Sequence, residues 1–468
     1  MRTVVGTVLC RIDLNNEIWT EDPGGKPAHS NALRLQSPPD LLSKHMPSHS
    51  IPIPDRRRSS RAAILHRPAQ GVGVGIIIAI TTGTQLRAFG PLGFGEVLLF
   101  GWIVLTLYRM AHSAPTEEPR HPLNRFWAVV VPVLMIGPVW ARVIGKLSPT
   151  APRDFFALGL VALFCFCAGT YLRSEDRERI AIAYAVTVTS VFLVFYLVPQ
   201  VASALGVTTK YYGTRYVGWA QNPNQVAIDM VWVPFILARR LYRDRSWRVP
   251  LVLLFFGSLL VGWISDSDSL RLGWGVGILI IGVRSVFSKD RSPLARQVGA
   301  AVFAVALGVV AFNAPNVAKR VGSYGDSLRF QQGTDDGGGR GRLQRHALIA
   351  AAYSPVIGLG PGLYSGLTHP FTNEEAHNTA LDLLMKAGAV GFVCLVVLCR
   401  RTWRKAVTDG WASVGAFSAL MMFTTGHNVL RHPASWLLIL LIAGLPEPSQ
   451  NSDRESTSQP ERRLVVIS

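Results

Sequence analysis

The sequence predicts an all-α fold: a polytopic membrane helix bundle of about 12 transmembrane helices with one long, partly helical periplasmic loop. The chain has 468 residues, of which 49% are hydrophobic, and a mean hydropathy of +0.27. Its apolar residues form blocks of about 17 to 25 residues, the length that spans a bilayer. Between the blocks, Lys and Arg gather in alternate short connections, as they do in membrane proteins.

Each apolar block is expected to form one span. The spans are predicted at 63–83, 91–110, 124–142, 155–172, 180–201, 223–241, 248–265, 269–287, 296–313, 376–400, 409–427 and 432–446. The domain organisation is therefore nine spans over 63–313, a long outer loop over 314–375 and three spans over 376–446. Residues 1–62, which end near "DRRRSSR", and residues 447–468 are interpreted as disordered cytoplasmic tails. No signal-peptide pattern follows Met1, and Met46 is an alternative start.

The positions of the basic residues predict which side each connection faces. Clusters follow the fourth, sixth, eighth and tenth spans: Arg173, Arg177 and Arg179; Arg239, Arg240, Arg243, Arg245 and Arg248; Arg284, Lys289, Arg291 and Arg296; Arg400, Arg401, Arg404 and Lys405. Basic loops stay in the cytoplasm, so both termini are expected inside and the odd-numbered connections outside. The connection after the third span, with Arg142, Lys146 and Arg153, fits this pattern poorly.

Several classes of protein lose support from the composition. The net charge of +18 lies mainly in the connections, without a basic face interleaved with aromatics, so no nucleic-acid partner is expected. The five cysteines form no CxxC pair and indicate apolar packing. There is no Walker A, HExxH or GxSxG motif, and Asp266 and Asp268 make only a weak cation site. No metal or cofactor is therefore expected.

The outer side is expected to collect basic residues near the ends of the spans: Arg215, Arg271, Arg340, Arg342, Arg345, His369 and His377. A guanidinium offers a planar fork of donors, so several of them together would suit a diphosphate. The alternatives are snorkelling for Arg271, cation–π contacts for Arg215 and a solvated face for the loop arginines. Asn222 and Asn224 are most simply a turn that caps the sixth span.

His377 lies in "EEAHNTALDLLMKAGAVG", residues 374–391, where an apolar span begins. A neutral His there can accept a proton from a sugar hydroxyl, and ionisable groups at membrane depth are candidates for function. Glu374 and Glu375 could orient the ring, or could simply favour the helix N-terminus. Upstream, a helix is predicted over 343–353, followed by a turn of Pro and Gly.

These motifs resemble the O-antigen ligase and O-antigen polymerase superfamily of bacterial envelope glycosyltransferases. The family's His-Asn, nine residues and Gly-x-x-Gly match His377, Asn378, Gly388 and Gly391. Its Gly-Arg, helix and P-x-x-G-x-G-x-G turn match Arg342, Pro355, Gly358, Gly360 and Gly362. "GTRYVGWAQNPNQVA" is similar to its Arg segment ending in Asn-Pro-Asn. Two positions depart from the pattern: His346 replaces a common aromatic, and "SLRLG" replaces "S-R-G" around Arg271.

The resemblance implies a GT-C-like fold in the bacterial inner membrane, with the active site facing the periplasm. It implies an undecaprenyl-diphosphate-linked glycan as donor and metal-independent, inverting attack by a hydroxyl of an acceptor glycan or lipid A core. Arg215, Arg271 and Arg342 would hold the diphosphate, and His377 would orient or deprotonate the acceptor. The expected substrate-binding residues are Arg340, Asn378, Gly360, Gly362, Asn222 and Asn224.

Two other activities remain open at this point. Repeat-unit polymerases for O-antigen or exopolysaccharide share the same motifs with ligases, so the motifs alone do not separate the two. A transporter of lipid-linked sugars would also want outer cations and many spans. Transporters often carry internal repeats, and no similarity between two halves is visible in this sequence.

Overall fold

The computed structural model describes residues 71–89, 92–112, 121–172, 174–211, 214–243, 246–287, 339–365 and 374–444, with a few positions between 297 and 304. The predicted tails over 1–62 and 447–468 lie outside the described residues. So do nearly all of the ninth predicted span, most of the long loop, and His369 within it.

The described part of the chain is mainly helical, as predicted. Its helices are Gly71–Ile80, α2 (Phe94–His112), α3 (Pro122–Val143), α4 (Ala151–Tyr171), α5 (Arg177–Leu197), α6 (Pro199–Ala204), α7 (Pro223–Met230), α8 (Val233–Arg243), α9 (Arg248–Ile264), α10 (Asp268–Phe287), α12 (Gly339–Ala352), α13 (Thr379–Asp409), α14 (Trp411–Thr424) and α15 (Pro433–Ala443), with a 3-10 turn at Ser174–Asp176. Two small antiparallel ribbons pair β1 (Arg87–Phe89) with β2 (Leu92–Gly93) and β3 (Lys210–Tyr211) with β4 (Arg215–Tyr216).

Six of the described helices are long and apolar enough to cross a bilayer: α2, α3, α4, α5, α10 and α13. The helices Gly71–Ile80, α9, α14 and α15 are apolar but shorter, and the sixth predicted span is divided between α7 and α8. Large apolar side chains such as Phe100, Val139 and Leu253 are exposed on these helices, which is typical of a surface that meets lipid. The total of about twelve spans stays a prediction.

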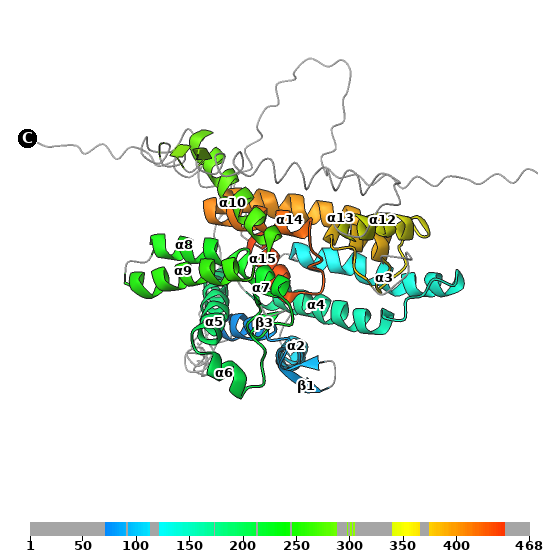
Figure 1. Cartoon of the computed structure of the whole chain (residues 1–468). Coiled ribbons are helices and arrows are strands. Elements are labelled where there is room, and N and C mark those ends of the chain that lie inside the picture. The colour runs from blue at the N-terminus through cyan, green and yellow to red at the C-terminus, as the bar shows by residue number, and fades with distance from the viewer. Residues whose placement is uncertain are drawn as a thin grey trace, which may run out of the picture. The chain divides into compact units, whose positions relative to one another are not determined.

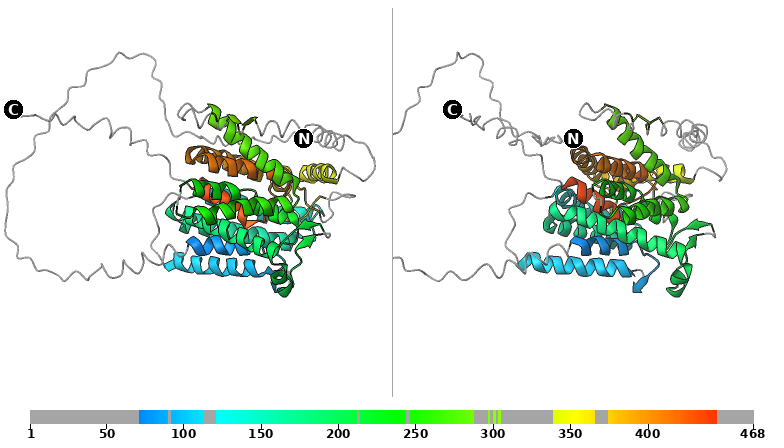
Figure 2. Two further views of the ribbon diagram at one scale, coloured as in Figure 1. Left: turned by 60° about the vertical axis from the view of Figure 1, so that its left-hand side comes forward. Right: turned by 90° about the vertical axis from the view of Figure 1, so that its left-hand side faces the viewer.

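Helix α13 is central to the site and packs against α3, α12, α14 and α15 (Figure 1). Its neighbour α14 in turn packs against α10 (Figures 1 and 2). Gly273 and Gly277 of α10 face the carbonyl oxygens of Ala419 and Gly415 on α14, with no room for a Cβ atom. Small residues four apart let membrane helices approach closely, so this spacing explains why α10 and α14 pack tightly.

Contacts between the connections gather at two ends of the bundle. At one end Arg239 pairs with Asp409, and Arg240 pairs with Glu178. At the other end Gln85 bonds to Thr208, and Asp154 pairs with Lys386. The first set joins connections predicted to be cytoplasmic and the second joins regions predicted to face outside, as an alternating topology requires. We call the second set the outer end, with its orientation kept as a prediction.

His121 begins α3 in a buried position that requires a neutral ring. Its Nδ1 accepts the Leu123 N–H at 3.1 Å, and its Nε2 lies 3.1 Å from the Leu440 carbonyl oxygen. Because a carbonyl can only accept, Nε2 carries the proton and Nδ1 has none. Burial, with Arg177 nearby, lowers the pKa of His121 from 6.5 to about 4.

Acid is therefore expected to destabilise the protein below about pH 6.5, because the unfolded chain binds a proton on His121 that the folded chain rejects. This stabilising contribution is complete above the unfolded pKa and declines as the pH falls towards 4. His121→Asn keeps a cap for α3 and removes the titrating ring. Thermal unfolding in detergent between pH 7.5 and pH 5 should show a smaller decline for this variant than for the parent. Parallel curves would contradict the assignment.

Candidate functional site

Helix α13 starts at the His-Asn motif and is interrupted at Gly388. That residue has φ 60° and ψ −160° inside an otherwise helical segment, a conformation that essentially only glycine adopts. The interruption deprives the Met385 and Lys386 carbonyls, and the Ala389 and Val390 N–H groups, of their normal helical partners. Such groups at membrane depth must find other partners within the protein.

The Pro-Gly turn after α12 supplies those partners. Leu359 N–H donates to the Met385 oxygen at 2.7 Å, and Gly360 N–H donates to the Lys386 oxygen at 2.9 Å. In return, Ala389 N–H donates to the Pro355 oxygen at 2.7 Å, and Val390 N–H donates to the Val356 oxygen at 3.2 Å. Two motifs that lie apart in the sequence are thus one structural unit, a broken helix sealed by a turn.

The glycines of both motifs are required by this close approach. Gly358 and Gly360 have φ of 71° and 80°. A Cβ on Gly358 would overlap the backbone of Lys386 and Ala387, one on Gly360 would overlap the Pro138 ring, and one on Gly388 would overlap the Val356 carbonyl. The spacing of the glycines in the sequence therefore reflects backbone packing.

Gly388→Ala is expected to destabilise the folded protein strongly, because it adds about 1–3 kcal/mol of backbone strain to the overlap with Val356. The check is the thermal unfolding midpoint in detergent. Gly275→Ala is the matched control, because Gly275 lies in α10 with open space around it and an ordinary backbone. An unchanged midpoint for Gly388→Ala would show that α13 is not held in this broken form.

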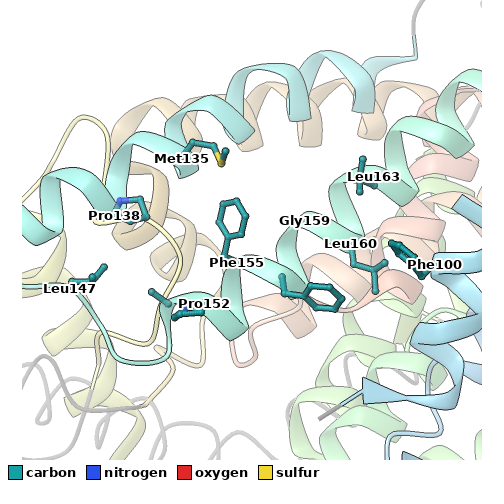
Figure 3. Close-up of a pocket in the computed structure, with 11 residues that line it drawn as sticks. Phe100, Met135, Pro138, Leu147, Pro152, Phe155, Gly159, Leu160 and Leu163 are labelled. Atoms are coloured by element: carbon teal, nitrogen blue, oxygen red, sulfur yellow. The ribbon is translucent and has the colours of Figure 1, made fainter. Parts of the chain in front are cut away.

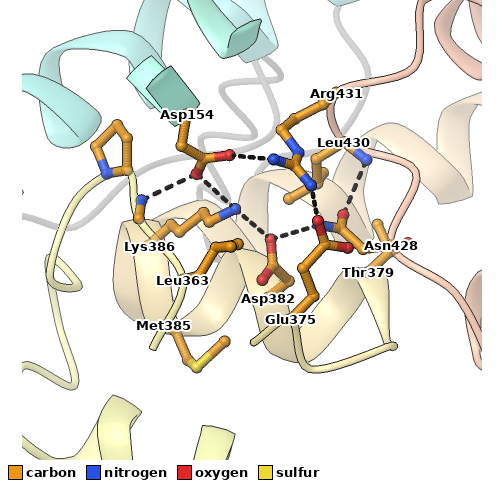
Figure 4. Close-up of polar contacts among 12 residues, drawn as sticks. Asp154, Leu363, Glu375, Thr379, Asp382, Met385, Lys386, Asn428, Leu430 and Arg431 are labelled. Atoms are coloured by element: carbon orange, nitrogen blue, oxygen red, sulfur yellow. Dashed lines mark hydrogen bonds and ion pairs between the residues drawn. The ribbon is translucent and has the colours of Figure 1, made fainter. Parts of the chain in front are cut away.

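A buried ionic cluster lies next to the helix break (Figure 4). The Nζ atom of Lys386 is 2.7 Å from Oδ2 of Asp154 and 2.6 Å from Oδ2 of Asp382, and all three side chains are 0% exposed. Gly362 N–H also donates to Asp154 at 2.9 Å, and the Asn428 amide donates to Asp382 at 2.9 Å. Charges buried at this depth are tolerated only when they are paired, so Lys386 ties α13 to the first turn of α4.

Arg431 extends the cluster towards the surface. Its Nη1 lies 3.2 Å from Oδ1 of Asp154, and its Nη2 contacts the Glu375 carboxylate. One guanidinium therefore bridges α4 and the segment that leads into His377.

His377 and Asn378 both lie at the start of α13. The Asn378 side chain caps the helix by accepting the Leu381 N–H at 3.1 Å and donates to the Thr425 oxygen at 3.2 Å. His377 is half-buried, with a left-handed φ of 50°. Its Nδ1 is 3.0 Å from the Glu375 carbonyl oxygen. Since a carbonyl cannot donate, Nδ1 carries the proton, and in the neutral ring Nε2 is the nitrogen that can accept one.

Arg215 and Arg271 meet at the turn between α9 and α10. Arg215 donates to the Asp266 carbonyl oxygen at 2.7 Å and to that of Ser265 at 3.3 Å. Arg271 donates to the Asp266 carboxylate at 2.7 Å and stacks 4.5 Å above the Trp263 ring. The two arginines, which are 56 positions apart by numbering, are therefore neighbours on one turn.

The segment 425–432 connects these groups. Thr425 bonds to Asn378, and Gly426 lies against the Ser269 side chain, two residues from Arg271. Asn428 and Arg431 reach the ionic cluster. This one segment therefore contacts the His-Asn motif, the first turn of the helix that carries Arg271, and the ionic cluster.

The other predicted residues are placed less centrally. Arg342 is exposed on α12, which packs against α13, and the side chain of Arg340 is not among those described. Asn222 caps α7 by accepting the Gln225 N–H at 3.1 Å, the local role that its sequence predicts, and Asn224 lies in the first turn of that helix. Gly360 and Gly362 act through their backbones, which bond to Lys386 and Asp154.

Four residues of the ionic cluster were not predicted from the sequence: Asp154, Asp382, Lys386 and Arg431. A signal for two of them was present, since Asp382 and Lys386 are four apart in an apolar block, and opposite charges at that spacing share a helix face. Asp154 and Arg431 come from remote segments, and no local pattern pairs them. In the described ranges, no group of three or more His, Cys, Asp and Glu side chains is arranged to bind a metal ion.

An apolar pocket of about 670 Å³ lies beside this end of the bundle, between α2, α3 and α4 (Figure 3). Its lining includes Phe100, Met135, Pro138, Phe155 and Leu163. Pro138 also touches the Gly360 turn, and Phe155 follows Asp154 directly. The pocket therefore begins next to the charged cluster and continues along α4 towards the middle of the bundle.

The fold and this site together define a helical membrane protein with clustered cations, carboxylates and a histidine at one end of its bundle. Residues 226–396 match the family described as O-antigen ligase, so the resemblance to that superfamily is confirmed. The matched segment includes Arg271, Arg342, His377 and Gly388. No curated protein matches the chain. The matched family is a glycosyl-transferring class of enzyme.

Proposed function

We propose that the protein transfers a glycan from undecaprenyl diphosphate to a sugar hydroxyl at the outer end of the bundle, in the manner of an O-antigen ligase. The observation that carries this proposal is that the segment 425–432 links the His-Asn motif to the turn where Arg215 and Arg271 meet, since Thr425 accepts from Asn378 and Gly426 lies against Ser269. Fixed guanidinium groups suit a diphosphate, and a histidine suits a hydroxyl that must lose its proton. The family match supports the class of reaction.

The proposed step is a direct displacement. The acceptor hydroxyl oxygen bonds to the anomeric carbon of the donor, and its proton passes to Nε2 of His377. The bond from that carbon to the diphosphate oxygen breaks, and the electron pair leaves with undecaprenyl diphosphate. Attack opposite the leaving group inverts the anomeric configuration. Arg215, Arg271 and Arg342 stabilise the departing charge, in a reaction that takes no metal ion.

Arg271 is held by Asp266 in the structure. An arriving diphosphate would take over the guanidinium donors that Asp266 now occupies. Exchange of one acceptor for another keeps each donor satisfied, so desolvation of the site costs little at that moment.

The acceptor is proposed to be lipid A core, with polymerisation onto a second lipid-linked repeat unit as the competing outcome. Protein in liposomes is given an undecaprenyl-diphosphate glycan together with either rough lipopolysaccharide or the donor alone. Mass spectrometry of the products separates ligation from chain growth. If the protein moves the donor across the bilayer without any transfer of the glycan, it is a transporter and the proposed function is wrong.

We further propose that the apolar pocket holds the polyprenyl chain of the donor. Gly159→Leu should fill the pocket, since Gly159 lines it with open space around its Cα atom. The polyprenyl chain would then lose about 100 Å² of apolar contact, which is worth roughly 2.5 kcal/mol of binding free energy. The KM for an undecaprenyl donor should therefore rise at least tenfold, with little change for a short-chain prenyl donor. Gly101→Leu on the exposed face of α2 is the matched control. An equal effect on both donors would show that the polyprenyl chain does not bind in this pocket.

A further inference from the structure

Arg431 occupies a position that the proposed reaction does not yet explain. It lies 20% exposed, between a fully buried Asp154 and the partly exposed Glu375. Lys386 is shared between Asp154 and Asp382, so Arg431 supplies the second positive charge of the cluster. Arg431 also connects the cluster to Glu375.

Glu375 is joined to His377 by geometry. The carbonyl oxygen of Glu375 accepts from Nδ1 of His377 at 3.0 Å, and the ring is carried on a residue with φ of 50°. A left-handed conformation at a residue other than glycine costs about 1–2 kcal/mol and persists only when its surroundings hold it. The Arg431 bridge to Glu375 is one such restraint, and the Asn378 cap on the following residue is another.

We infer that Arg431 is a positioning residue for His377, acting through Glu375 and anchored on Asp154; this inference rests on the proposed function. The path runs from the buried Asp154 through the guanidinium to the Glu375 carboxylate (Figure 4). It continues from the Glu375 carbonyl oxygen to the imidazole of His377. The rigid end of this path is α4, which Lys386 ties to α13. Arg431 thereby fixes which ring nitrogen faces the acceptor.

The test is a double-mutant cycle in the transfer assay with Arg431→Met, Glu375→Ala and the double variant. Each single change should lower kcat by about 10- to 100-fold, because small misplacements of a catalytic group cost that much. The KM for the lipid donor should stay unchanged. The double variant should be no worse than the poorer single variant, since both changes break one path. Arg431→Lys should recover only part of the lost kcat. The lysine restores the positive charge, but one ammonium group cannot match the guanidinium fork that reaches both carboxylates.

Arg142→Met is the control, since Arg142 is an exposed arginine in the last turn of α3. A second readout does not need catalysis: the rate at which diethyl pyrocarbonate modifies His377, followed by mass spectrometry. Modification should be faster in Arg431→Met and unchanged in Arg142→Met. Thermal unfolding of each variant identifies any that fail to fold.

The outcomes separate the two proposals. If the parent transfers glycan, four results would overturn the role of Arg431 and leave the proposed function intact. These are additive losses in the double variant, an unchanged kcat in the single variants, a raised KM for the lipid donor, and an unchanged rate of His377 modification in Arg431→Met. If the parent transfers no glycan to any acceptor tested, the proposed function is wrong, and the positioning role of Arg431 is then also wrong.

Discussion

Lys386→Met is expected to cost about 3–5 kcal/mol of folding stability, enough to prevent accumulation of the folded protein. Lys386 is fully buried and is shared by Asp154 and Asp382, so its removal leaves an uncompensated carboxylate inside the bundle, a change of the size given. The measurement is the yield of monodisperse protein in detergent together with its unfolding midpoint. Lys210→Met, at an exposed position on β3, is the matched control.

A second substitution separates charge balance from mere loss of packing. Lys386→Met combined with Asp382→Asn leaves Asp154 paired with Arg431 at 3.2 Å and removes the unpaired carboxylate. We expect the double variant to recover most of the lost stability, because replacing both members of a buried ion pair is often close to neutral. If the double variant is as unstable as Lys386→Met alone, the cluster does not act as a balanced set of charges.

His377→Ala is expected to lower kcat for glycan transfer by about 10²–10⁴-fold, the usual contribution of a positioned general base. The KM for the lipid donor should change little, since the arginines are proposed to bind the diphosphate. The measurement is steady-state transfer by purified protein. Folding should be retained, because Asn378 still caps α13.

His112→Ala is the control for that experiment, because His112 is an exposed histidine at the last turn of α2. Equal activity of His377→Ala and the parent, with both correctly folded, would reduce His377 to a residue at the start of a helix. A loss confined to KM would move it from catalysis to binding.

Much of the fold could be predicted from the sequence, because length and apolar content determine where a chain can span a bilayer. Most of the predicted spans within the described residues coincide with a helix, including α3, α4 and α13. The ends were less accurate: α13 was expected to stop at residue 400 and continues to Asp409. The basic residues beyond the apolar block do not break a helix, so hydropathy alone could not locate its end.

The candidate site was predicted only in part. His377, Arg215 and Arg271 could be selected because ionisable residues near span boundaries are conspicuous, and the structure brings the two arginines together at Asp266. Their proposed roles remain to be tested. The partnership of Asp154 with Lys386 could not be predicted, since it depends on how α4 and α13 pack.

The connection after the third span illustrates the same limit. Its basic residues fitted the charge rule poorly, yet Lys146 lies 5.2 Å from the Tyr353 ring after α12, and Ser148 lies within hydrogen-bond distance of Leu363 in the glycine turn. Contacts with the site therefore give a physical reason for Lys146 to lie at this end of the bundle, while the side of the membrane that this end faces stays a prediction.

The most direct test of the proposed transfer is the release of undecaprenyl diphosphate by purified protein given a native lipid-linked glycan and an acceptor, in the presence of a chelator. We predict that one undecaprenyl diphosphate is released for each glycan joined to the acceptor, with inverted anomeric configuration, and that His377→Ala lowers the rates of formation of both products by the same factor. A donor that stays intact with every acceptor, or transfer that stops when divalent cations are removed, would contradict the proposed reaction.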